Sequence, residues 1–72
     1  MLRYIPVQKK FKSDELGEYI SFDIKIINEN NDILLSVPDV STDGKLVSDL
    51  CSLCTAGKLD PIHIYDVIED NI

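Results

Sequence analysis

Two cysteines three positions apart are the residues best suited to chemistry. Cys51 and Cys54 form a C-x-x-C motif, a spacing used by dithiol oxidoreductases and by one half of many zinc sites. A redox pair usually lies at a helix N-terminus, where amide dipoles lower the thiol pKa, but these cysteines fall well inside an expected helix. A zinc site needs further ligands, and His63 is the only other soft candidate. We therefore expect structural thiols on the apolar side of the helix, with a redox or zinc-binding pair as the alternative.

A histidine followed by acids near the C-terminus is the second candidate. His63 precedes Asp66 by three positions and Asp70 by seven, so on a helix a carboxylate can orient the imidazole or favour its protonated form. No nucleophile with oxyanion-stabilising donors accompanies them, and the first helical turn disfavours a cation. We predict no catalytic residue and interpret these side chains as a solvated helix face available to a partner. This acidic stripe comprises His63, Asp66, Glu69 and Asp70.

Oxygen-rich segments offer a third kind of chemistry, calcium binding. Residues 28–32 read Asn-Glu-Asn-Asn-Asp, and Asp39 and Asp43 precede the first expected helix. Neither segment has the twelve-residue calcium loop with its central glycine and terminal bidentate glutamate. We interpret them as a hairpin turn and a helix cap, and predict neither a metal nor a cofactor.

Alternating apolar and polar residues predict the elements that position these groups, beginning with three strands at residues 2–12, 18–27 and 33–37. The segments 13–17 and 28–32 between them are rich in turn residues, which favours antiparallel connections. The second strand has the clearest pattern, and its bulky residues should share one buried face. These residues are Ile20, Phe22, Ile24 and Ile26.

The first strand has two distinct sides. We predict that Ile5, Val7 and Phe11 face inward, with Tyr4 on the opposite side. By the same alternation, the outer face of the sheet carries apolar residues. A small monomer seldom exposes a contiguous group of such residues unless a partner binds there. They are Tyr4, Tyr19, Ile27 and Leu34. A protein partner, or a second copy in a homodimer, would bury them, whereas scattered exposed apolar residues are the simpler interpretation.

Two helices are expected to cover the inner face. The first begins after Val40, runs to about Ala56 with an apolar arc that includes both cysteines, and ends at Gly57 in a left-handed conformation. The second is capped by Asp60, with Pro61 at its first position. Its inward face should consist of Ile64, Tyr65, Ile68 and Ile72. The order is β-β-β-α-α in a single α+β domain spanning residues 1–72.

Composition restricts the class of protein. The chain has 72 residues, a net charge of −6 and 44% hydrophobic residues, so it should fold rather than remain disordered. Its negative charge opposes nucleic acid and anionic membrane surfaces. No apolar run approaches the roughly 20 residues that cross a bilayer, and no secretory signal is apparent. We expect a cytoplasmic protein.

The second half of the chain and the central strand resemble a known family. The segments that show the resemblance are Val-Pro-Asp-Val-Ser-Thr-Asp at residues 37–43, the apolar helix after it, and Pro-Ile-His-Ile-Tyr-Asp-Val-Ile-Glu-Asp at residues 61–70. They are similar to short uncharacterised proteins of clostridia and related Firmicutes, classed as a domain of unknown function. The resemblance implies a small bacterial cytoplasmic protein and carries over no activity. We therefore expect a nonenzymatic protein-binding or assembly module, with a thiol, redox or zinc-binding protein using Cys51 and Cys54 as the alternative.

Overall fold

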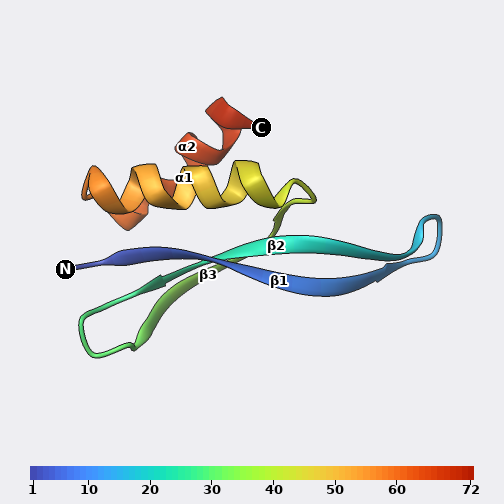
Figure 1. Ribbon diagram of the computed structural model, residues 1–72, viewed down its shortest axis with the longest axis horizontal. Helices are drawn as coiled ribbons and strands as arrows, with labels where there is room; N and C mark the ends of the chain where they lie inside the picture. Colours follow the sequence, from blue (N-terminus) through green and yellow to red (C-terminus); the bar gives the residue numbers. More distant parts are fainter.

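The computed structural model describes all 72 residues and has the predicted α+β architecture. Its elements are β1 (Arg3–Ser13), β2 (Gly17–Ile27), β3 (Ile33–Ser41), α1 (Gly44–Ala56), the 3-10 turn η1 (Pro61–His63) and α2 (Ile64–Asn71). The strands form one antiparallel sheet in the order β1-β2-β3. Both helices lie on one side of that sheet (Figure 1). The predicted β-β-β-α-α order is confirmed.

The hydrophobic core lies between the sheet and α1. Ile24 and Ile26 of the central strand are completely buried, and Val37 of β3 joins them. The apolar arc of α1 supplies the opposing surface, and Ile64 of α2 completes the cluster. The α1 residues buried there are Val47, Leu50, Cys51 and Cys54.

Tyr4 determines which side of β1 faces this core. It pairs with Ile26, and directly opposed residues of antiparallel strands point to the same face. Its side chain is only 4% exposed, and its hydroxyl donates to the Leu59 carbonyl at 2.6 Å. Burial, followed by the nearby Cys54 and Asp60, raises the pKa of Tyr4, so the hydroxyl remains a donor at neutral pH.

The predicted sidedness of β1 was therefore wrong. Since Tyr4 faces inward, alternation turns the odd-numbered residues Ile5, Val7 and Phe11 outward. The prediction had placed Tyr4 on the outer side from the alternation alone. In the fold the aromatic ring fills the core while the loop after α1 supplies the hydrogen-bond acceptor that a buried tyrosine needs.

The β1–β2 hairpin is longer than the helical layer that covers it. Figure 1 shows its closed end projecting past the start of α1. Ile20, predicted to be buried, lies on this projection and is 49% exposed, whereas Phe22 is partly buried against the core. The part of the hairpin that α1 covers ends below Gly44, the first residue of the helix, where an added Cβ would lie 2.6 Å from Phe22 Cζ. Helix α1 thus begins directly over the Phe22 ring and leaves Ile20 uncovered.

Replacing Gly44 by alanine should destabilise the fold. The new methyl group would overlap the Phe22 ring, and overpacking of this kind costs about 1–2 kcal/mol in free energy of unfolding. Urea denaturation measures the change, with Ser48→Ala on the exposed face of α1 as the control. The smaller side chain in Phe22→Leu should reduce the penalty of Gly44→Ala. A double-mutant cycle with zero coupling energy would contradict this packing.

The end of α1 differs from the prediction by one residue. Lys58, with φ of 53°, takes the left-handed conformation, whereas Gly57 is right-handed with φ of −81°. The amide of Lys58 donates to the Thr55 carbonyl at 3.2 Å, and that of Leu59 donates to the Cys54 carbonyl at 3.0 Å. These two bonds form a Schellman motif. The motif places the left-handed residue where the chain must turn back so that Leu59 can pack against the core.

The C-terminal segment begins as predicted but buries a different face. The Asp60 side chain accepts from the Ile62 amide at 3.2 Å, and Pro61 opens the 3-10 turn. Ile64 is fully buried, with Val67 and Ile68 partly buried, which is the i, i+3, i+4 pattern of one helix face. Tyr65 and Ile72 are more than half exposed, so their predicted inward orientation was wrong. In Figure 1, α2 lies on the far side of α1 from the sheet.

Candidate functional site

The two cysteines are buried in the core face of α1, as expected for structural thiols. Both are free thiols. Burial, followed by the neighbouring Cys54, raises the pKa of Cys51 to about 11. Burial also raises the pKa of Cys54. Because the thiolate is the nucleophile and the metal ligand, this environment opposes both uses of the motif. No three His, Cys, Asp or Glu side chains come together as a set of metal ligands.

The thiols should react slowly in the folded protein. At pH 7.5 an alkylating reagent is expected to label Cys51 and Cys54 at least tenfold more slowly in buffer than in a denaturant that unfolds the chain, because the native thiols are protonated and covered. Mass spectrometry of quenched samples measures both rates. Equal rates would contradict the buried placement and would restore the redox or zinc hypothesis.

The acidic stripe is exposed to solvent along η1 and α2. None of His63, Asp66, Glu69 and Asp70 takes part in an ion pair. His63 ends the 3-10 turn and makes no side-chain capping hydrogen bond to α2. The stripe therefore presents unpaired charges on a short helix, and no other element packs a side chain onto them as an acid–base partner would.

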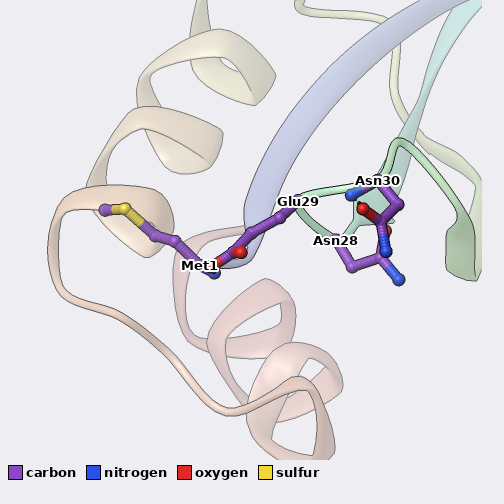
Figure 2. Close-up of polar contacts among 4 residues, drawn as sticks. All are labelled: Met1, Asn28, Glu29 and Asn30. Atoms are coloured by element: carbon purple, nitrogen blue, oxygen red, sulfur yellow. Dashed lines mark hydrogen bonds and ion pairs between the residues drawn. The ribbon is translucent and has the colours of Figure 1, made fainter.

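The oxygen-rich segment at residues 28–32 forms the β2–β3 turn. The Asn28 side chain accepts from the amides of Asn30 and Asp32 at 2.9 and 3.0 Å, and Asn31 is left-handed with φ of 65°. Outside the turn, Arg3 donates to the Asn31 side chain at 2.7 Å. Figure 2 shows the Met1 amino group against the Glu29 carboxylate. That ammonium lowers the pKa of Glu29 through a hydrogen bond and its charge. These contacts hold the turn against the start of β1.

A polar cluster in the outer face of the sheet was not predicted. β3 bulges between its pairs with Phe22 and Ile24, and the bulge places Asp39, with φ of 51°, beside β2. The Asp39 carboxylate accepts from the Ser21 hydroxyl at 2.6 Å and from the Tyr19 hydroxyl at 2.9 Å. The hydrogen bond to Asp39, followed by burial and the Asp39 charge, raises the pKa of Tyr19.

Asp23 is the buried charge at the centre of this cluster. It is fully buried, accepts from the Asp39 amide at 3.0 Å, and lies 2.9 Å from Lys9 Nζ. Burial, the largest influence, would raise the pKa of Asp23, but Lys9, the Asp39 amide and Lys25 together outweigh it and hold that pKa below its ordinary value. The signal in the sequence was an aspartate at the middle of the central strand, which requires a cation or amide partner from a neighbouring strand.

Asp23→Asn should destabilise the protein in a pH-dependent way. The substitution leaves Lys9 without its partner, and we expect a loss of about 1–3 kcal/mol at pH 7. Because Lys9 and the Asp39 amide hold the pKa of Asp23 below its ordinary value in the folded state, the stabilisation is present above the unfolded-state pKa and disappears as pH falls through the folded-state pKa.

Urea denaturation at pH 7, 5 and 3 measures the difference between Asp23→Asn and the natural protein, which should shrink at the lowest pH. Asp49→Asn, at an exposed acid of α1, serves as the control and should change little. A difference that is the same at every pH would contradict the ionised state of Asp23.

The outer face of the sheet has no helix over it (Figure 1). It carries Ile5, Val7, Phe11 and Tyr19, all partly buried. Phe11 and Tyr19 stack across the strands with ring centroids 5.6 Å apart. Of the residues predicted for this face, Tyr4 lies inside instead, and Ile27 is on the outer side but only 8% exposed. Leu34 is 52% exposed, at the irregularity where β3 pairs with the end of β2.

One hollow opens elsewhere, between the N-terminal segment and the loop after α1. Its volume is about 330 Å³, and it is lined by Met1, Leu2, Lys58 and Leu59. This is at the lower end of the range for small-molecule sites, which combine an apolar lining with several convergent polar groups. None of the predicted site residues lines it.

The fold and these surfaces define a small acidic α+β domain with a one-sided sheet. No helix is both long enough and apolar enough to span a membrane. The chain belongs to DUF6514, a family of unknown function whose model matches residues 1–72. The resemblance noted in the second half and central strand is thus confirmed and covers the whole chain, while occurrence in clostridia and related Firmicutes stays a prediction. No curated protein and no solved structure matches the chain.

Proposed function

We propose that this protein is a nonenzymatic protein-binding module of the bacterial cytoplasm and that the outer face of its sheet is the contact surface. The observation that carries the proposal is the one-sided sheet. Both helices lie on one side (Figure 1), while the other side presents Ile5, Val7 and a stacked aromatic pair. Aromatic residues surrounded by polar groups are typical of contact surfaces between proteins.

The state of the reactive groups supports binding rather than catalysis. The thiols are buried and protonated at neutral pH. The Asp23 carboxylate is held by Lys9 and a backbone amide, and that of Asp39 by two hydroxyl groups. These contacts fix the polar centre of the outer face, so its apolar neighbours form a rigid surface, which lowers the entropic cost of binding.

The acidic stripe is a second contact region in this proposal. Its carboxylates are exposed and free of ion pairs in a chain of net charge −6. Such a surface accelerates association with a basic partner, and the acceleration weakens as salt is added. Charge reversal in Asp66→Lys/Asp70→Lys should therefore slow association and reduce its dependence on salt.

Affinity capture from the source cell tests the contact surface. Val7→Lys places a charge in the outer face, and Ser52→Lys places the same charge on the exposed side of α1. We expect the natural chain and Ser52→Lys to retain the same partner and Val7→Lys to lose at least 90% of it, because a desolvated lysine opposes burial of the face. Thermal unfolding verifies that both variants are folded. Equal recovery by all three chains would refute the outer face as the contact surface.

A further inference from the structure

The terminal helix α2 has two apolar sides. The inner side, formed by Ile64, Val67 and Ile68, packs against the core. The outer side carries Tyr65 and Ile72, which are 56% and 58% exposed. Residues seven positions apart fall on the same face of a helix, and Figure 1 shows α2 as the outermost layer of the fold. The outer side of α2 is therefore an apolar stripe that the fold leaves exposed.

Carboxylates lie directly beside this stripe. Ile62, in the 3-10 turn three residues before Tyr65, extends the stripe and is 76% exposed. Asp66 follows Ile62 by four positions and Glu69 follows Tyr65 by four, and residues at this spacing are neighbours on a helix surface. No lysine or arginine occurs in residues 59–72. The surface thus combines apolar side chains with acids that have no cation near them in this segment.

The fold itself makes no use of these acids. Residues 61–72 form no hydrogen bond or ion pair with residues 1–59, so the apolar contacts of the inner side hold α2 in place. Glu69 and Asp70 lie in the last turn, at the negative end of the helix dipole, where no basic residue offsets them. Acids at this end lower the stability of a helix, and an eight-residue helix is too short to be stable alone. A cation supplied by a partner would remove this unfavourable interaction.

We propose that the outer side of α2 is a docking surface for a basic amphipathic helix of another protein. The apolar side of that helix packs on Tyr65 and Ile72, and lysines or arginines on its flanks pair with Asp66, Glu69 and Asp70. Two helices whose apolar stripes face each other bury both stripes, with the charged groups at the rim. The inference rests on the proposed binding function and names the partner class of its acidic contact region.

Charge complementarity selects this partner over the other occupants of such a surface. Nucleic acid and anionic membranes are repelled by the acids. A second copy of α2 would place acids against acids. Because α2 is only about 12 Å long, the contact area is small, and the attraction of opposite charges acts mainly on the association rate. The complex should therefore be weak and should weaken further as salt is added.

A synthetic helical peptide tests the docking surface. The probe has about 15 residues, with leucines at the i, i+3, i+4, i+7 spacing and lysines at the other positions, and fluorescence anisotropy measures its binding. We expect this leucine–lysine peptide to bind. A peptide with glutamates in place of the lysines should not bind, and one with serines in place of the leucines should bind about tenfold more weakly.

Substitution of the acids locates the charged part of the contact. Glu69→Gln/Asp70→Asn should weaken binding of the leucine–lysine peptide about fivefold. These changes remove acids from the negative end of the dipole and so stabilise α2, which means that weaker binding cannot come from loss of the helix. Asp14→Asn/Glu15→Gln alters two exposed acids at the hairpin tip and is the matched control. It changes the net charge equally and should reduce binding far less.

The apolar part of the contact has its own matched pair. Tyr65→Ser should weaken binding of the same peptide about tenfold, whereas Leu16→Ser, at a 73% exposed residue of the hairpin tip, should leave it unchanged. Hydrogen exchange reports the stabilisation of α2. The Ile72 amide, which donates to the Ile68 carbonyl at 2.9 Å, should exchange more slowly when the peptide is bound.

Several results would overturn the docking surface. Equal losses in the α2 and hairpin-tip variants would reduce the binding to attraction by net charge. Equal binding of the peptide without leucines would remove the apolar contact. A dimer in sedimentation velocity that is lost in Tyr65→Ser would assign the surface to a second copy.

Failure here is distinguishable from failure of the proposed function. Val7→Lys should bind the leucine–lysine peptide as the natural chain does, because the outer face of the sheet takes no part in this contact. Slower partner association in Asp66→Lys/Asp70→Lys, together with no peptide binding by the natural chain, would leave the acidic stripe a steering surface and would refute docking on α2.

Discussion

The attachment of Tyr4 to the end of α1 is the contact on which the rest of the structure depends. Its amide bonds to the Thr55 side chain and its hydroxyl to the Leu59 carbonyl, so one residue joins the first strand to the helical layer. That attachment selects the inner face of β1. It thereby sends Ile5, Val7 and Phe11 to the face without a covering layer, and the proposed contact surface follows from it.

A second constraint acts on the opposite side of the sheet. Helices α1 and α2 both cover the same face (Figure 1), so the polar groups of the other face must find their partners within the sheet. The structure meets this need by placing an ionised aspartate under a lysine and a bulge rather than by adding a further layer. The hydrogen bonds of Asp23 and Asp39 compensate for the burial of these polar groups, and they fix the position of β3 relative to β2.

Sequence reasoning identified the elements well because each rests on local signals. The alternation in β2, the caps at Asp43 and Asp60, and the apolar arc of α1 are all visible within one segment, and each is present in the fold. The errors concern relations between segments. The side of β1 depends on what Tyr4 meets at residue 59, and the exposure of Ile20 depends on where α1 begins above β2. The cluster around Asp23 depends on a bulge in β3 whose position only the register reveals.

The projecting end of the β1–β2 hairpin has a consequence for how the chain tolerates changes in length. Beyond Phe22 its strands are joined by their own ladder, the Phe11–Tyr19 stack and the Lys10–Glu18 ion pair, with no helix resting on them. Removing one facing residue from each strand at the tip would shorten the projection and leave the interior undisturbed. Removing a single residue from one strand would shift the pairing between that point and the tip by one residue, so that the side chains of that strand there would change faces relative to their partners. Insertions and deletions in this arm are therefore expected in matched pairs.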